Sequence, residues 1–248
     1  MVTGASGGLG RAIATELAGR GASLVLTART RDALEELAGA TCGEVVVADL
    51  SERGDVRRLC GMLGDIDVLV ANAGVGGGGA LVESTEDEID FALDVNLRAP
   101  MVMATEFAQQ RAALGRSGQM VMIGSLSGMV ATPNTRLYNA TKFGLRGFTL
   151  ALRQDAAELG IGVTLVAPGF IDTAGMFAEN NTSVPGFVRT KSPDDVAAAV
   201  VKAIESNPPE VYVAPVELRA SATVGTIAPW LSEAIQRRLG TAEMTRDL

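Results

Sequence analysis

The stretch "TGASGGLGRAIATELAGRG", residues 3–21, leads from a short strand through a glycine-rich turn into an amphipathic helix. Gly4, Gly8 and Gly10 allow a tight turn and a close approach of a ligand to the backbone. The helix that follows begins with unpaired N–H groups and with the positive end of the helix dipole. We therefore expect the turn to bind a phosphate group, and the rest of the chain has to decide between this interpretation and an ordinary loop.

Short apolar runs follow this helix and alternate with helix-like stretches. The runs begin at Ser23, Glu44, Asp67, Gln119, Gly162 and Glu210, and the helical stretches cover residues 11–19, 31–38, 51–63, 87–114, 138–159 and 193–206. Runs that are apolar almost throughout are typical of strands buried on both faces. Their alternation with helices predicts parallel βαβ units with right-handed crossovers. Only Met1 and Val2 precede the turn, which leaves open whether the natural start lies upstream.

The composition predicts one soluble domain, residues 1–248, because 47% hydrophobic residues are enough for a single core and no apolar run could span a membrane. The net charge of −8 argues against nucleic acid as a partner, since such binding needs clustered cations. Cys42 and Cys60 lack metal-ligand spacing, so we expect no metal site. The absence of a signal peptide predicts a cytoplasmic protein.

The chain contains no histidine, which excludes Ser-His-Asp and Cys-His catalysis. Proton transfer must therefore use tyrosine, lysine, cysteine or a carboxylate. The motif "YNATK" places Tyr138 and Lys142 one helical turn apart on one face, although a helix start with a snorkelling lysine would look the same. Ser125 ends an apolar run, at the carboxyl end of a predicted strand, where parallel sheets bind ligands.

The strand that begins at Ser23 ends with Ala28, Arg29 and Thr30. A dinucleotide-binding fold contacts the adenosine ribose at about this distance from the glycine turn. An aspartate there would bind the ribose 2′-hydroxyl, whereas an arginine beside a hydroxyl suits a 2′-phosphate. We therefore predict NADP(H) rather than NAD(H) as the cofactor, with a solvated surface arginine as the alternative interpretation.

With these residues identified, the chain resembles the classical short-chain dehydrogenase/reductase (SDR) family over essentially its full length. The matches, in order, are "TGASGGLG", Asp49 in "ADL", "ANAG" at 71–74, Asn96 in "DVNL", Ser125 in "GSLSG", "YNATK" at 138–142 and "PGFIDT" at 168–173. The resemblance implies a Rossmann-type, doubly wound α/β fold, with a mostly seven-stranded parallel sheet and helices on both faces. Ala71 departs from the usual "NNAG", and Ser6 and Gly7 stand where some NADP(H)-dependent members have a basic residue.

The resemblance also implies the catalytic roles. Tyr138 would be the general acid in carbonyl reduction and the base in alcohol oxidation. Lys142 would favour the phenolate and bind the nicotinamide ribose. Ser125 would hydrogen-bond the substrate oxygen, and Asn96 would hold a water that relays protons to Lys142.

The cofactor contacts follow from the same resemblance. They are Gly4, Ser6, Gly8, Leu9, Gly10, Arg29, Thr30, Asp49, Leu50, Asn72, Ala73, Gly74, Tyr138, Lys142, Pro168, Gly169, Ile171 and Thr173. Two of these have structural alternatives, because Asp49 could cap the helix that follows it and Asn72 could only stabilise the sheet.

Two segments bear on substrate and assembly. Residues 170–192 correspond to the family's substrate loop, and their apolar content predicts an apolar carbonyl or alcohol, although ordinary packing of a surface loop would look similar. The tail, residues 217–248, contains Ile227 and Trp230 in an uncharged stretch too short to span a bilayer. We expect the tail to pack at the interface of a homodimer or homotetramer, with a lid or peripheral membrane contact as alternatives.

The sequence thus predicts an NADP(H)-dependent oxidoreductase that interconverts a carbonyl and a secondary alcohol by hydride transfer. A non-catalytic NADP(H)-binding redox sensor is one alternative, because a fold does not guarantee an activity. A 3-oxoacyl reductase-like enzyme of fatty-acid metabolism, within the same family, is another. Epimerase or dehydratase activity fits poorly, because such family members usually have a larger C-terminal domain and a different glycine spacing.

Overall fold

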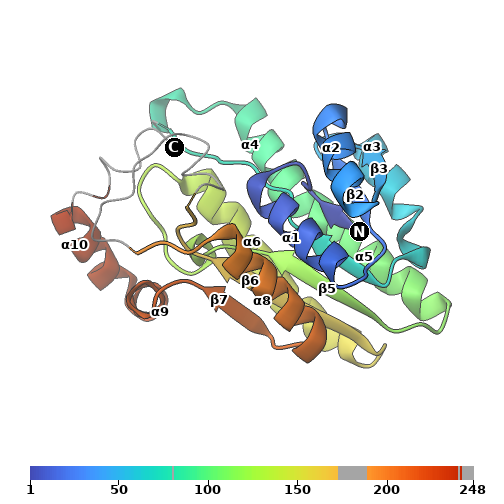
Figure 1. Ribbon diagram of the computed structural model, residues 1–248. Coiled ribbons are helices and arrows are strands. Elements are labelled where there is room, and N and C mark those ends of the chain that lie inside the picture. The colour runs from blue at the N-terminus through green and yellow to red at the C-terminus, as the bar shows by residue number, and fades with distance from the viewer. Residues whose placement is uncertain (80, 173–188, 240, 242–248) are drawn as a thin grey trace.

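A parallel sheet runs through the middle of the molecule, with helices in front of it and behind it (Figure 1). The computed structural model describes residues 1–79, 81–172, 189–239 and 241. Its strands are β1 (Val2–Thr3), β2 (Val25–Ala28), β3 (Glu44–Val47), β4 (Val68–Ala71), β5 (Gly118–Ile123), β6 (Ile161–Pro168) and β7 (Glu210–Val213). The seven strands lie in the order β3-β2-β1-β4-β5-β6-β7, so the chain starts in the centre and winds outward in both directions. The predicted doubly wound α/β fold is confirmed.

Helices cover both faces of this sheet. The α-helices of the described residues are α1 (Gly8–Gly19), α2 (Arg31–Thr41), α3 (Arg53–Cys60), α4 (Glu86–Leu93), α5 (Ala99–Ala113), α6 (Arg136–Ala157), α8 (Pro193–Ser206), α9 (Val216–Ile227) and α10 (Pro229–Leu239). One apolar core lies between the sheet and α1, α2 and α8, and the other between the sheet and α3, α5 and α6. Figure 1 shows α1 and α8 in front of the strands and α5 and α6 behind them.

The stretch 87–114, which the sequence predicts to be one helix, consists of three pieces. α4 passes through a π-helical turn, Asp94–Arg98, into α5. Pro100 has no N–H to donate to the carbonyl of Asn96, four residues earlier, so the regular α-helical ladder is interrupted here. The N–H of Ala99 reaches back five residues to the carbonyl of Asp94 instead. The turn leaves the Asn96 side chain buried, with 1% of its surface exposed.

The C-terminal tail forms two helices, α9 and α10, beside the segment that follows β5. Thr226 Oγ1 donates to the carbonyl of Met129 at 3.0 Å, and Gln236 Nε2 donates to that of Ala131 at 2.9 Å. A Cβ at Gly225 would lie 2.6 Å from Val130 Cγ2, so this glycine allows α9 to approach the segment closely. No helix in the described part of the chain is long and apolar enough to cross a membrane.

Candidate active site

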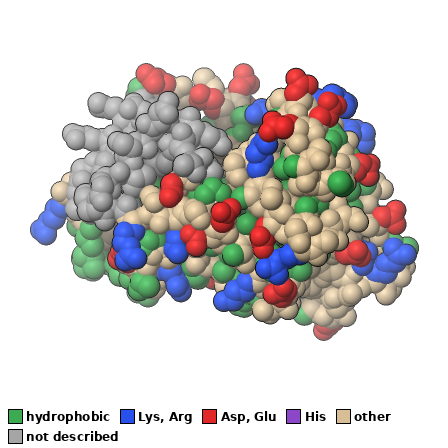
Figure 2. Space-filling view, viewed as in Figure 1, with side chains coloured by type: hydrophobic (Ala, Val, Ile, Leu, Met, Phe, Trp, Pro, Cys, Tyr) green, Lys and Arg blue, Asp and Glu red, His purple; other side chains and the backbone are tan. Residues whose placement is uncertain are grey.

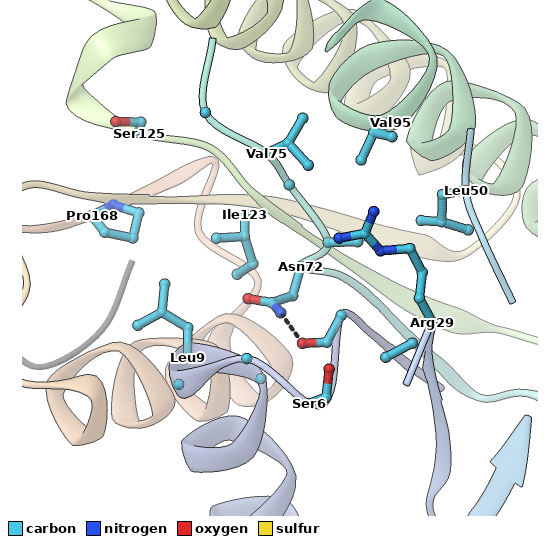
Figure 3. Close-up of a pocket in the computed structure, with 18 of the residues that line it drawn as sticks. Ser6, Leu9, Arg29, Leu50, Asn72, Val75, Val95, Ile123, Ser125 and Pro168 are labelled. Carbon is cyan, nitrogen blue, oxygen red and sulfur yellow. Dashed lines mark hydrogen bonds between the residues drawn. The ribbon is translucent and has the colours of Figure 1, made fainter. Parts of the chain in front are cut away.

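The carboxyl ends of the central strands meet around one cavity (Figure 3). Every cofactor contact predicted from the sequence and lying within the described residues lines this cavity: Gly4, Ser6, Gly8, Leu9, Gly10, Arg29, Thr30, Asp49, Leu50, Asn72, Ala73, Gly74, Tyr138, Lys142, Pro168, Gly169 and Ile171. Thr173 lies outside the described residues. Motifs that are far apart in the chain therefore share one site, at the edge of the sheet where parallel strands bind ligands.

The glycine turn has the geometry that a phosphate needs. Gly4 has a φ of +63°, and a Cβ there would lie 2.7 Å from Ala73 Cα. A Cβ at Gly10 would lie 2.2 Å from the carbonyl oxygen of Gly4. The N–H groups of Gly8, Leu9 and Gly10, in the first turn of α1, donate to no acceptor in the part of the chain that the structure describes. These groups are available to an anion at the positive end of the helix.

Asn72 ties the end of β4 to this turn. Its Nδ2 donates to the carbonyl oxygens of Thr3 at 2.9 Å and Gly4 at 3.2 Å, and the dashed line in Figure 3 starts from this side chain. The backbone N–H groups of Asn72 and Ala73 both donate to Thr3 Oγ1 at 3.0 Å. Asn72 therefore has a structural role at the end of β4, where it supports the glycine turn. It also lines the cavity, so its side chain is available to a ligand as well.

Arg29 and Thr30 follow β2 at another edge of the cavity, and both are exposed. Arg29 forms no ion pair within the described residues, whereas its neighbour Arg31 pairs with Glu35 at 3.4 Å. Figure 3 shows the Arg29 side chain extending into the cavity. This part of the site thus offers an uncompensated positive charge to an anionic ligand group.

Asp49 lies after β3 and stabilises the turn that leads to α3. Its Oδ1 accepts hydrogen bonds from Ser51 N–H at 2.9 Å and from Ser51 Oγ at 2.7 Å. Its backbone N–H donates to Asp55 Oδ2 at 2.8 Å. Since α3 begins at Arg53, Asp49 caps this turn rather than the helix itself.

Tyr138 and Lys142 lie in the first turns of α6 and face Ser125 at the end of β5. Ser125 Oγ accepts a hydrogen bond from Ser127 N–H at 3.1 Å, and its interaction with Tyr138 favours the phenolate. Lys142 Nζ lies 5.5 Å from the centroid of the Tyr138 ring and donates to the carbonyl of Ile123 at 3.0 Å. The predicted serine, tyrosine and lysine are therefore together.

Burial controls the pKa values of the two titratable groups. Burial raises the pKa of Tyr138 above its ordinary value of 10.0, and the hydrogen bond with Ser125 partly opposes this rise. Burial also lowers the pKa of Lys142 from 10.5 to about 8. Burial therefore dominates the pKa of Tyr138, and the expected effect of Lys142 on the phenol stays a prediction. At neutral pH this phenol is a proton donor rather than a base.

Asn96 lies behind the cavity rather than in its lining. Its Oδ1 accepts from Val75 N–H at 2.7 Å, and its Nδ2 donates to Val75 O at 2.9 Å and to Thr141 Oγ1 at 3.3 Å. A Cβ at Gly74 would lie 3.4 Å from Asn96 Oδ1 and 3.6 Å from Lys142 Nζ, so the two side chains approach the same glycine. Asn96 holds the backbone of Val75 in place, and its role in a proton relay stays a prediction.

The cavity has further lining residues that sequence reasoning missed. They are Gly7, Thr27, Ala28, Ala48, Val75, Gly76, Val95, Ile123 and Gly124. Most lie next to a predicted site residue, at the end of a strand or in the turn after it. The rule that parallel sheets bind ligands at these ends could therefore have found them.

The predicted substrate segment, residues 170–192, is described only at its two ends. Phe170 and Asp172 run beside Lys191, whose backbone accepts from Asp172 N–H at 2.9 Å and donates to Phe170 O at 3.0 Å. The two cations at this end have partners, since Arg189 pairs with Glu217 at 3.8 Å and Lys191 pairs with Asp195 at 3.5 Å. Residues 173–188, which contain most of the apolar side chains of the segment, lie outside the described residues.

Comparisons with known proteins agree with this geometry. The ketoacyl reductase HetN of Nostoc sp. is 31% identical to this chain, over 99% of this chain and 90% of its own length. A metagenomic short-chain oxidoreductase solved in complex with NADP is 35% identical, with a TM-score of 0.71 over 86% of this chain and 95% of that one. A short-chain dehydrogenase from Sphingobium yanoikuyae in complex with NADPH is 25% identical, with a TM-score of 0.79 over 94% of each chain.

The family model described as short chain dehydrogenase matches residues 1–184, which include the glycine turn, Ser125, Tyr138 and Lys142. Together with the relatives above, this match shows that the chain belongs to the short-chain dehydrogenase/reductase family and is an oxidoreductase that acts on CH–OH groups.

Proposed function

We propose that this chain is an NADP(H)-dependent enzyme that interconverts an apolar ketone and the matching secondary alcohol, with Tyr138 as the general acid and base. One observation carries the proposal. Tyr138 and Ser125 line the same cavity as the glycine turn and Arg29, so a proton donor and an anion-binding surface share one site. Apolar side chains, among them Val75 and Val95, line the same cavity and suit an apolar substrate.

The residues present fit a dinucleotide phosphate. A side chain at Gly4 or Gly10 would meet backbone atoms, and the unpaired N–H groups at the start of α1 would hold the pyrophosphate. Arg29 and Thr30 would hold a 2′-phosphate, and Ala28 leaves the end of β2 without the carboxylate that favours NAD(H). The solved complexes of similar SDR proteins with NADP and NADPH support the same choice.

The protein's own groups would perform the proton chemistry. NADP(H), when bound, supplies or accepts the hydride. In reduction, Tyr138 donates its hydroxyl proton to the substrate oxygen, and Ser125 hydrogen-bonds the same oxygen as negative charge develops on it. Lys142, whose pKa burial lowers to about 8, would restore the proton to the phenol through Asn96 and a water.

Consumption of NADPH with a panel of apolar ketones and quinones tests the enzyme against the redox-sensor alternative. We expect turnover by the wild-type protein. Tyr138→Phe should lose it, by a factor of about 100 or more, while still binding NADPH, because the ring stays and only the proton donor is removed. A Tyr138→Phe variant that turns over as fast as wild type, or a wild-type protein that binds NADPH but reduces nothing on the panel, would favour the sensor.

The Arg29→Asp variant tests the preference for NADP(H) over NAD(H) independently of turnover. The variant places a carboxylate where a 2′-phosphate would bind, so affinity for NADPH should fall by about ten-fold or more while affinity for NADH is kept or improved. The measurement is the dissociation constant of each cofactor from fluorescence titration. Arg31→Asp is the matched control, because Arg31 pairs with Glu35 and does not line the cavity. An unchanged ratio of the two constants in Arg29→Asp would overturn the NADP(H) assignment.

A 3-oxoacyl substrate is a second candidate, which the similarity to the ketoacyl reductase HetN favours. Reduction of a short 3-oxoacyl thioester faster than reduction of simple ketones would support it. We further propose that the protein works in the cytoplasm as a homodimer or homotetramer.

A further inference from the structure

Asn139, the residue after Tyr138, uses its whole side chain to hold the segment that follows β5. It lies on α6 with 6% of its surface exposed. Its Nδ2 donates to the carbonyl of Ser127 at 2.8 Å and to that of Val130 at 3.0 Å. Its Oδ1 accepts from Thr132 N–H at 3.1 Å and from Thr135 Oγ1 at 2.7 Å. Both ends of the amide are therefore engaged, which fixes its orientation.

The segment that Asn139 holds also positions Ser125. The N–H of Ser127 donates to Ser125 Oγ at 3.1 Å, and the N–H of Gly128 donates to Ser125 O at 3.0 Å. Since Ser127 N–H occupies an acceptor position on Ser125 Oγ, the Ser125 hydroxyl is free to point its hydrogen at Tyr138. The carbonyl of Ser127 accepts from Asn139, so Ser127 links the amide on α6 directly to the serine on β5.

The same segment also contacts α6 closely at Gly128. A Cβ at Gly128 would lie 2.7 Å from the carbonyl oxygen of Lys142, so only glycine allows this approach. Asn139 and the Gly128–Lys142 contact therefore both dock the start of this segment on the turn of α6 that follows Tyr138. Neither Asn139 nor Gly128 lines the cavity.

We propose that Asn139 is a positioning residue, which sets the distance between the Ser125 and Tyr138 hydroxyls by fixing the 126–135 segment on α6. The inference rests on the proposed function, because it assigns both hydroxyls to one substrate oxygen. Two donors that must reach the same atom tolerate little error in their separation, and a displacement of about 1 Å can lower a rate by about 100-fold.

The surroundings of Tyr138 make its titration a specific readout of this geometry. Its pKa has two causes, burial, which raises it, and the hydrogen bond with Ser125, which lowers it. Lys142 is the charged side chain beside the ring. Among the other charged residues nearby, Asp94 pairs with Arg98 at 3.8 Å, and Arg136 donates to Gly79 O at 2.8 Å. Displacing Ser125 should therefore raise the pKa of Tyr138.

The experiment compares Asn139→Leu and Asn139→Asp with wild type. Leucine keeps the branching of the side chain and removes every hydrogen bond of the amide, and aspartate removes the two donors to Ser127 and Val130. We expect kcat for ketone reduction to fall by about 10- to 100-fold with the NADPH dissociation constant within about two-fold of wild type. We also expect the pH profile of alcohol oxidation to move to higher pH, as in Ser125→Ala. In the Ser125→Ala background, Asn139→Leu should cause no further movement.

Thr149→Val is the matched control, because Thr149 is a buried polar residue of the same helix whose Oγ1 donates to Leu145 O on that helix. It should lower thermal stability without moving the pH profile. Thr135→Val, which removes one donor to Asn139 and no helix cap, is a milder variant should the others fail to fold. Asn139 and Thr135 variants with a wild-type pH profile and kcat would overturn the inference. Activity retained in Tyr138→Phe would instead overturn the proposed function.

Discussion

At the residue scale, Tyr138 determines how the activity should depend on pH. Burial raises its pKa, so the phenol keeps its proton at neutral pH and can serve as the acid in reduction. Oxidation needs the phenolate, so its rate should increase as the pH rises. We expect kcat for reduction to change little between about pH 6 and 7.5 and kcat for oxidation to rise over the same range and beyond.

Initial rates in both directions, with untagged protein, measure this difference. Since the chain contains no histidine, an inflection in this range has to come from the Tyr138 and Lys142 site or from another shifted group. Lys142→Met should therefore remove any inflection near pH 8, the pKa of the buried lysine. An oxidation rate that does not change with pH would contradict the role of Tyr138, and a profile unchanged in Lys142→Met would contradict that of the lysine.

Lys142 should also make stability depend on pH. Its pKa is about 8 in the folded chain and 10.5 ordinarily, so the unfolded chain binds more protons between these values. Stability should therefore rise with pH across this window and be lowest below about pH 8. The full effect is roughly 3 kcal/mol, at about 1.4 kcal/mol per pH unit.

Urea unfolding at several pH values between 8 and 9.5, below the range in which tyrosines titrate, measures this effect. The rise in the free energy of unfolding should disappear in Lys142→Met. Lys202→Met is the control, because Lys202 is exposed on α8 and should leave the rise intact. Equal pH dependence in wild type and Lys142→Met would show that the buried lysine is not the cause.

At the element scale, the junction between β1 and α1 depends on the absence of a side chain at Gly10. A Cβ there would lie 2.2 Å from Gly4 O and 2.7 Å from Ala5 Cα, both backbone atoms that cannot rotate away. Gly10→Ala should therefore move the turn, lower the free energy of unfolding by about 1–3 kcal/mol and weaken NADPH binding by about ten-fold or more.

Isothermal titration and urea unfolding check both effects. Gly39→Ala is the control, because Gly39 is an exposed helix residue whose added Cβ meets nothing within 4 Å. It should gain up to about 1 kcal/mol of stability and bind NADPH as wild type does. Unaltered NADPH affinity in Gly10→Ala would mean that the turn does not hold the cofactor.

The elements that the sequence predicts best are those whose ends are fixed by residues close by in the chain. α8 begins and ends where its pattern places it, at Pro193 and Ser206, because Ser192 and Asp195 form a capping box and Asn207 ends the helix in the left-handed conformation. The glycine turn is predictable for a similar reason, since Gly4 needs a positive φ.

Features that depend on distant contacts could not be predicted. The π-helical turn has a local cause in Pro100, but the buried position of the Asn96 side chain depends on hydrogen bonds to Val75, twenty-one residues away. α9 and α10 depend on docking against Met129 and Ala131, about a hundred residues earlier, so the tail shows only a weak pattern of its own. The hydrogen bond from Asn139 to the Ser127 carbonyl could not be predicted either, because the motif "YNATK" does not indicate which segment its second residue contacts.

At the scale of the whole molecule, one group of exposed apolar side chains lies on the C-terminal helices. Ile227 is 79% exposed, Trp230 72% and Val216 74%. Figure 2 shows hydrophobic side chains gathered over α9 and α10 at the lower left, while acidic and basic side chains are interspersed over much of the remaining visible face. Large exposed apolar side chains that lie close together mark interaction surfaces more often than ordinary surface. This is the surface that we expect to bury in a homodimer or homotetramer.

The combined variant Ile227→Ser and Trp230→Ser should therefore dissociate the assembly to a smaller species, because it removes two large apolar anchors without touching the contacts of Thr226 and Gln236 that dock the tail. Light scattering coupled to size exclusion measures the mass. Leu81→Ser combined with Val82→Ser is the matched control, since these side chains are exposed to a similar degree, 73% and 93%, but lie before α4 rather than on the tail. A wild-type monomer, or a variant with the wild-type mass, would exclude the tail as the interface. In the latter case the α4 side of the molecule becomes the surface to test, and a loss of mass in the control would identify it directly.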